Sequence, residues 1–206
     1  MKEEIESYLE TEFEQKLFSA STTYLENDSD PIRINSFAYS LRELIRNVFE
    51  RRAPEEKVKS CTWFEKETDN GKPTRKQRYI YSVQGGLSHN YVKDDLGMDV
   101  LEPWKEIKKI IDSLSKFTHV DDKTFDIPHK ECQELAEEIL RTLLSIFNMI
   151  KDVRTELHDE LASHIDNELM STFVSNGMPD IDILSNRSYV EHSEVTEYEV
   201  VGIDDR

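Results

Sequence analysis

The chain has few cysteines, glycines and prolines for its length of 206 residues. Its two cysteines, Cys61 and Cys132, exclude a disulfide framework and a cysteine-rich zinc site. Six glycines and six prolines are too few for the many tight turns of an all-β protein. No apolar run approaches the roughly 20 residues that a membrane span requires. These absences predict a soluble helical protein, located in a reducing cytoplasm.

Charge of one sign dominates what is present. The 43 acidic and 26 basic residues give a net charge of −17, which disfavours nonspecific binding of nucleic acid. The segment 51–78 is the exception, because its nine lysines and arginines outnumber its five acids by four. At physiological salt, screening over roughly 8 Å limits the repulsion from distant acids. A polyanion would therefore be met in this segment, although a second protein could dock there as well.

Apolar residues recur at helical spacing over most of the chain. Asp30 followed by Pro31 is a strong helix start, Thr74 and Ser88 are further N-cap residues, and Gly85 and Gly97 are stops. From residue 128 onward no glycine or proline interrupts the pattern for about 40 residues, which predicts one very long helix or two helices with a bend near Asp152. The predicted helices are 2–25, 31–52, 74–84, 88–96, 103–117 and 128–175.

Two regions depart from this helical pattern. The polar connector 53–73 contains Trp63 and Phe64, so we expect it to fold back and pack through these two rings. The segment 189–203 is rich in valine, tyrosine and threonine and is predicted to be a strand. The fold class is therefore mainly α, a multi-helix bundle with a short C-terminal β segment. We expect a helical domain at 1–176 and an acidic linker and strand at 177–206, the start of a truncated β domain.

One candidate active site follows from the chemistry of helical ribonucleases. In ribonucleases of the HEPN type, four to six residues stand between an arginine and the histidine that follows it, and a HEPN-like bundle is one form the predicted fold could take. Here Arg154 and His158 have only three residues between them. Arg42 and Arg46 could instead meet His119 across two helices. In a nuclease, Arg46 would steady phosphate, His119 would be general base or acid, and Glu43 would orient one of them. The alternative is that Arg42 and Arg46 pair with Glu43 or Glu50, and that His119 caps its helix.

Two further clusters are weighed in the same way. Asp152, Glu156, Glu160 and His164 share one helix face, but no second helix offers matching ligands, so a solvated acidic stripe is favoured and no metal site is assigned. The run Arg75, Lys76 and Arg78 is followed by Tyr79 and Tyr81, an interleaving that nucleic-acid-binding surfaces use. The alternative for this run is a solvated helix start with its tyrosines packed inward.

Three strings carry a family resemblance. They are SFAYSLRELIRNVFERRAPEEKVKSCTWF at 36–64, GKPTRKQRYIYSVQGGLSHNYV at 71–92 and SLSKFTHVDDKTFDI at 113–127. In order and spacing they resemble the domain described as a predicted pPIWI-associating nuclease, found in prokaryotic conflict systems. The resemblance covers 36–127 and, more weakly, the region to residue 206. It implies a helical domain from a bacterial defence setting, part of a larger protein.

The resemblance implies a component of a prokaryotic anti-phage or anti-plasmid defence system, and we expect a nuclease or a nucleic-acid-engaging helical domain that binds through Arg75, Lys76 and Arg78. The alternative is a non-enzymatic helical adaptor or dimerisation module that recruits or senses a protein partner. Expected partners are nucleic acid, a defence-system protein and a second copy of the chain, with no membrane. The cofactor stays open, since only a metal-dependent nuclease would use Mg²⁺.

Overall fold

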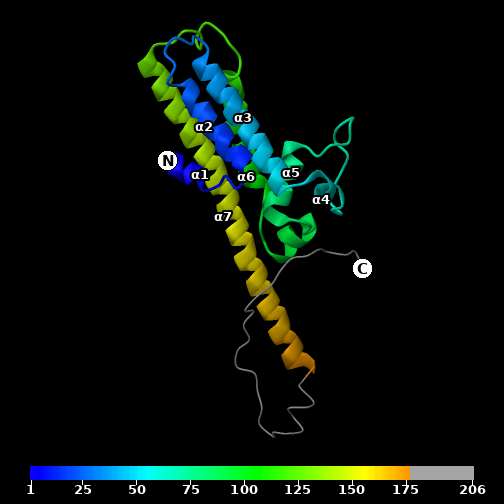
Figure 1. Ribbon diagram of the computed structural model, residues 1–206. Helices are drawn as coiled ribbons and strands as arrows, with labels where there is room; N and C mark the ends of the chain where they lie inside the picture. Colours follow the sequence, from blue (N-terminus) through cyan, green and yellow to red (C-terminus); the bar gives the residue numbers. More distant parts are fainter. Residues whose placement is uncertain (177–206) are drawn as a thin grey trace.

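The computed structural model describes residues 1–176, and every regular element in this part of the chain is a helix. The central helix is α3 (Arg33–Arg52), which packs against α2 (Glu12–Tyr24), α5 (Arg75–Gln84), α6 (Leu101–Phe117) and α7 (His129–Asn176). Figure 1 shows α2, α3 and α7 running along one long axis, with α5 and the short α4 to one side. The predicted mainly α fold is confirmed for these residues.

The core forms around α3 because its apolar side chains recur every three or four residues. Phe37, Leu41, Leu44 and Val48 are buried, and they meet buried residues of α6 and α7 in one continuous cluster. The ring of Tyr79 on α5 stacks on Trp104 of α6 with 5.4 Å between ring centroids. The hydrophobic core therefore joins all the long helices into one body.

The prediction of one helix over 2–25 is wrong. The chain forms α1 (Lys2–Glu6) and then leaves the helix before α2 begins. A capping box restarts it: Glu14 donates its backbone N–H to the Thr11 hydroxyl at 3.1 Å, and Thr11 donates its own to the Glu14 carboxylate at 3.3 Å. The turn lets α1 pack against α7 while α2 packs against α3.

The connector after α3 contains a short helix, α4 (Glu55–Lys59), and then folds back as predicted. Trp63 is half-buried against the core, donates its indole N–H to the Gly85 carbonyl at 3.3 Å, and stacks on His89 at 5.4 Å. Phe64 is half-buried as well. The predicted Thr74 cap of α5 is confirmed, and this helix ends at Gly85, whose φ of 60° suits glycine. Beyond it, residues predicted as an α-helix form a single π-helical turn, η1 (Tyr91–Asp95).

Asn35 fastens the C-terminal end of α6 to the N-terminal end of α3. Its side-chain amide is buried and donates to the carbonyls of Phe117 and His119, at 3.0 and 2.9 Å, and to the Thr124 hydroxyl at 3.0 Å. These bonds satisfy carbonyls that the helix end leaves without partners. They also fix the position of His119.

The last described helix, α7, is continuous over 48 residues, so the option of two helices is not what forms. At 1.5 Å per residue it is about 72 Å long, and its C-terminal end projects beyond the other helices (Figure 1). No helix among residues 1–176 is both long and apolar enough to cross a membrane. The linker and strand predicted at 177–206 lie outside the described residues.

Candidate nucleic-acid interface

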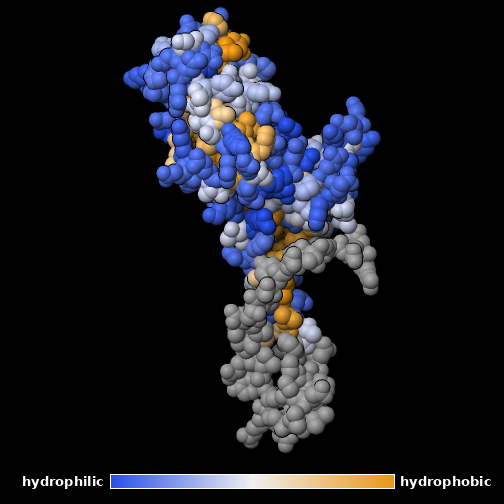
Figure 2. Space-filling view, viewed as in Figure 1, coloured by the Kyte–Doolittle hydropathy of each residue, from blue (hydrophilic) through white to orange (hydrophobic). Residues whose placement is uncertain are grey.

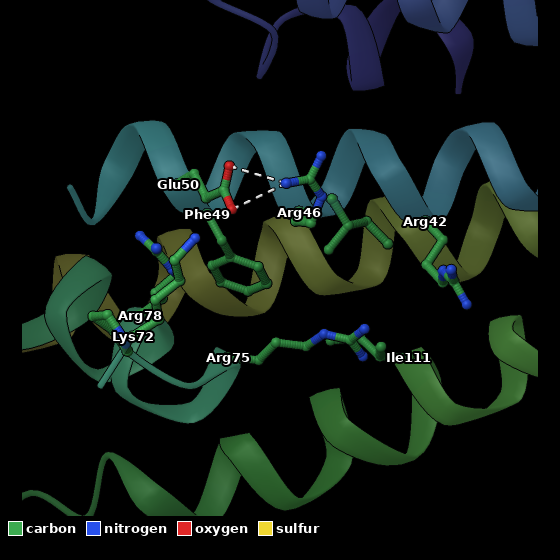
Figure 3. A pocket seen from close by; sticks show the side chains of 10 residues that line it. Arg42, Arg46, Phe49, Glu50, Lys72, Arg75, Arg78 and Ile111 are labelled. Carbon is green, nitrogen blue, oxygen red and sulfur yellow. Dashed lines mark hydrogen bonds and ion pairs between the residues drawn. The ribbon is translucent and has the colours of Figure 1, made fainter. Parts of the chain in front are cut away.

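A cavity of about 170 Å³ lies where α3, α5 and α6 meet. Figure 3 shows its arginines on α3 and α5, with Arg46 paired to Glu50 along α3 and the side chain of Arg75 extending toward Ile111 on α6. Apolar side chains from three segments form much of its wall. Its lining residues are Arg42, Ile45, Arg46, Phe49, Glu50, Lys72, Pro73, Arg75, Arg78 and Ile111. We call this cavity the α3–α5 pocket.

The start of α5 is held firmly, which fixes the basic residues beside it. Gln77 donates its backbone N–H to the Thr74 hydroxyl at 3.3 Å, and its side chain accepts from the Thr74 backbone at 2.9 Å. The Gln77 side-chain amide also donates to the Glu65 carbonyl at 2.6 Å, which anchors the connector. A turn at Gly71, where φ is 66°, then brings Lys72 to the pocket. The pocket is therefore built by local capping and turn chemistry.

The α3–α5 pocket is strongly positive, with five cations and one carboxylate among its lining residues. On α3, Arg46 pairs with Glu43 at 2.8 Å and with Glu50 at 3.2 Å, and the hydrogen bond to Glu43 raises the pKa of Arg46. Arg42 lies 3.8 Å from Glu43. These contacts confirm the predicted pairing of the two arginines with neighbouring acids. Their guanidinium groups are thereby held at the pocket.

The cations contributed by α5 and its preceding turn differ in their partners. Arg78 donates to the carbonyl of Ala53, the residue that ends α3, so part of its role is to cap that helix. Arg75 is exposed and forms neither a hydrogen bond nor an ion pair with any residue that the structure describes. Arg75 is therefore available to an external anion.

The predicted nucleic-acid-binding run divides between two places. Arg75 and Arg78 line the α3–α5 pocket, but Lys76 does not. Lys76 lies near His89 instead, where burial and the charge of Lys76 together lower the pKa of that histidine. Two of the three predicted residues thus meet the arginines of α3. The third, Lys76, lies near His89, the ring that stacks on Trp63.

The contacts described for His119 and for Arg46 lie at different levels of α3. The His119 carbonyl is bound by Asn35, and Arg46 lies eleven residues further along α3, about 16 Å at 1.5 Å per residue. The ion pairs of Arg46 with Glu43 and Glu50 hold it at its own level of the helix. These contacts do not support the expected meeting of the two side chains, which stays a prediction. Arg46 and Glu43 remain together, and the catalytic roles of all three residues remain predictions.

The carboxylates of the predicted acidic stripe on α7 are exposed to solvent. Asp152, Glu156 and Glu160 are exposed, whereas His164 packs edge-on against the ring of Tyr91 at 5.6 Å. Within the described part of the chain, no three histidine, cysteine, aspartate or glutamate side chains are grouped so that they could hold a metal ion.

Sequence reasoning missed that Lys72 and Arg42 share a cavity with Arg75. Lys72 stands in the basic run, but no periodicity places it opposite α3. The apolar wall of Phe49 and Ile111 was predicted only as core. The signal that was available is the excess of basic residues in 51–78, which is the segment that supplies three of the five cations.

Comparison with known families identifies the chain. Residues 6–143 and residues 150–206 match two successive models, both described as predicted pPIWI-associating nuclease. No curated protein and no solved structure matches the chain. The two matched regions cover nearly the whole sequence, and the first contains all three strings at 36–64, 71–92 and 113–127 as well as the α3–α5 pocket. The chain belongs to the family of predicted pPIWI-associating nucleases.

Proposed function

We propose that this chain is a nucleic-acid-engaging domain and that the α3–α5 pocket binds the phosphate backbone. The observation that carries the proposal is the convergence of five cations from α3, the turn before α5 and α5 itself on one cavity of an otherwise acidic protein. Arginine side chains suit this role because their planar guanidinium groups bind phosphate oxygens through two hydrogen bonds at once. Membership of a predicted nuclease family supports the same class of ligand.

The arginines of the α3–α5 pocket differ in their partners, and we propose that they differ in how they bind phosphate. Arg42 and Arg46 are positioned by Glu43 and Glu50, so their guanidinium groups are held in place before phosphate binds. Arg75 has no partner among residues 1–176 and is the side chain that would close on a bound phosphate. The release of counterions from the nucleic acid would then favour binding, with a slope against salt that counts the contacts.

A salt titration of binding tests this role. The protein would be mixed with fluorescent single-stranded RNA and DNA at 50 to 200 mM KCl, and anisotropy would give the affinity. Arg75→Gln should weaken binding of both strands and lower the slope of log affinity against log salt by about 1. The matched control is Lys130→Gln, because Lys130 is 90% exposed on α7 and lies far along the chain from the pocket. Equal behaviour of the two variants would contradict the proposal.

For cleavage, we propose that Arg46 steadies a phosphate and that Glu43 orients it, with His119 as the predicted general base or acid. The pairing of Arg46 with Glu43 supports the first two roles, and the separation of His119 weakens the third. The assay would follow RNA and DNA cleavage by the full chain with and without Mg²⁺. Arg46→Ala should lower the rate about 10²-fold or more, as loss of one preorganised charge-stabilising donor does. His119→Ala distinguishes the two views, since an unchanged rate removes His119 from the site.

A second candidate function is a non-enzymatic adaptor in a prokaryotic defence system. It is favoured by the projecting end of α7, along which apolar residues are visible in Figure 2 and where Leu169 is 40% exposed. The family description names a pPIWI protein as an associate, and we propose that class of protein as the partner. The adaptor predicts binding of such a partner or of a second copy without any cleavage. Sedimentation of the chain alone and with the partner would test it. The HEPN-like form of the bundle and the cytoplasmic location stay predictions.

A further inference from the structure

A second basic cavity, of about 350 Å³, lies beside the C-terminal end of α3 and the middle of α7. It is lined by Tyr8, Arg52, Lys151, Arg154, Thr155 and His158 and shares no residue with the α3–α5 pocket. Its volume falls within the range of about 300 to 1,000 Å³ that small-ligand sites have. We call it the α3–α7 pocket.

Arg52 is the most constrained cation of the α3–α7 pocket. Its side chain is 20% exposed, and its Nε is buried with no hydrogen-bond partner in the described part of the chain. Its nearest carboxylate, that of Glu10, is 3.7 Å away, whereas the same carboxylate lies 2.6 Å from Arg51. Burial, together with the charges of Arg51 and Arg154, lowers the pKa of Arg52. The positive charge here is therefore only partly balanced.

The residues from α7 face the same cavity because of their spacing. Arg154 and Thr155 come three and four residues after Lys151, and His158 comes four and three residues after those two, so the four lie on one helix face. Neither Lys151 nor Arg154 forms a hydrogen bond or ion pair with a described residue. Burial and the charge of Arg154 lower the pKa of His158, which favours its neutral form near pH 7. Two cations and two neutral polar groups thus stand opposite Arg52.

Tyr8 forms a fixed part of the wall. Its hydroxyl donates to Oδ1 of Asn148 at 2.6 Å, and its ring lies against Phe147 at 5.2 Å between centroids. Both partners belong to α7, so Tyr8 and the basic residues of that helix keep one arrangement. A ligand would therefore meet Tyr8 in a fixed position, beside the face of α7 that carries the basic side chains.

We propose that the α3–α7 pocket binds a phosphate monoester, either a free nucleotide or the phosphorylated end of a nucleic acid. Arg52, Lys151 and Arg154 together carry three positive charges, and the carboxylates whose charges reach Arg52, those of Glu10 and Glu14, are both already paired with Arg51. A phosphate monoester carries a charge of about −1.5 to −2 at pH 7, which balances most of this positive charge, and it offers three strong acceptor oxygens. A phosphodiester or a carboxylate carries one negative charge. The cavity also has room for more than the phosphate group.

Calorimetric titration tests the proposal with defined ligands. AMP and inorganic phosphate should bind the full chain, and adenosine should not. Arg154→Gln should weaken AMP binding about ten- to hundredfold, the effect expected for loss of a charged hydrogen bond. Lys130→Gln, an exposed residue that lines neither pocket, should leave AMP binding unchanged. Malonate, a dicarboxylate of similar charge, should bind far more weakly than phosphate.

Three results would overturn it: no binding of AMP or phosphate, equal binding of malonate, or an unaltered affinity in Arg154→Gln. Arg52→Gln changes a half-buried residue, so its affinity is interpreted only if its melting temperature matches that of the wild type. Lys151→Gln is the alternative variant, because Lys151 is exposed.

A second titration compares an oligonucleotide bearing a 5′-phosphate with one bearing a 5′-hydroxyl. Preference for the phosphorylated end, lost in Arg154→Gln, assigns the site to nucleic-acid ends. AMP binding without that preference assigns it to free nucleotides. Both readouts are separate from the Arg75 salt slope, so this inference and the proposed function can fail independently.

Discussion

Glu14 is a buried carboxylate that serves two elements. It closes the capping box of α2 with Thr11, and it accepts a hydrogen bond from Arg51 on α3 at 2.8 Å. Only 2% of its side chain is exposed. Burial by itself would raise the pKa of Glu14, but the hydrogen bonds from Arg51 and from the backbone lower it below its ordinary value of 4.5. The carboxylate is therefore charged and bound in the folded protein.

We expect Glu14→Gln to lower the free energy of unfolding at pH 7 by about 3 kcal/mol, the lower end for breaking a buried pair, because Arg51 keeps Glu10 as a partner. Since the folded-state pKa lies below the unfolded-state value, the wild-type protein gains this stability above about pH 4.5 and loses it as the pH falls. Urea unfolding at pH 7 and pH 3.5 would measure both effects. The control is Glu12→Gln, whose exposed pair with Lys16 should contribute at most about 1 kcal/mol. A loss at pH 7 no larger than that of the control would contradict the assignment.

At the scale of the element, α5 depends on its first residue. The capping box of Thr74 and Gln77 fixes the turn that carries Lys72 and Arg75 to the α3–α5 pocket. Loss of a threonine cap costs about 1 kcal/mol.

Thr74→Ala should therefore lower the free energy of unfolding by about 1 kcal/mol and also weaken binding of nucleic acid, because the pocket loses its fixed edge. Urea unfolding and fluorescence anisotropy would give the two values. Thr23→Ala is the matched control, since Thr23 is exposed near the end of α2 and its hydroxyl donates to the Ser19 carbonyl. A stability loss without a change in binding would show that the cap does not position the pocket.

The two halves of α7 should respond differently to truncation. Leu143 is fully buried, whereas Leu169, on the projecting end, is 40% exposed. Leu143→Ala should cost about 2 to 5 kcal/mol by leaving a cavity in the core. Leu169→Ala should change the unfolding free energy of the isolated chain by less than about 0.5 kcal/mol. Thermal and urea unfolding would test both. A large loss for Leu169→Ala that depends on protein concentration would instead indicate that a second copy covers this end.

The helices could be predicted from the sequence more fully than the contacts between them. Local signals are sufficient for the Thr74 cap and for the unbroken α7, which lacks glycine and proline. The break before Thr11 also had a local signal, the threonine followed three residues later by Glu14, but the apolar spacing across it was equally helical. The π-helical turn at 91–95 has no such signal. The α3–α5 pocket depends on how α3, α5 and α6 pack, so its membership could not be read from the order of residues.

At the scale of the whole molecule, the charge of −17 is a source of self-repulsion. The acids are more crowded in the folded protein than in the unfolded chain, and salt screens their repulsion over a shorter distance as its concentration rises.

The melting temperature should therefore rise when KCl is increased from 20 to 200 mM. Differential scanning calorimetry in a buffer without phosphate would measure it, since phosphate could bind the basic pockets. Choline chloride over the same range is the control for ion identity. A melting temperature that falls with both salts would mean that the ion pairs of α2 and α3 stabilise the fold more than the net charge destabilises it.

The unbroken α7 fixes how residues 150–176, the described part of the second family-matched region, are rotated about the helix axis relative to the first. The first match ends at residue 143 and the second begins at 150, so their junction lies inside a helix and not in a loop. One residue inserted there would turn everything beyond it by about 100°, because a helix has 3.6 residues per turn. Lys151 and Arg154 would then no longer face Arg52. A seven-residue insertion would nearly restore the angle and displace the distal part by about 10 Å along the axis. Length changes at this junction are thus constrained in direction as well as in distance.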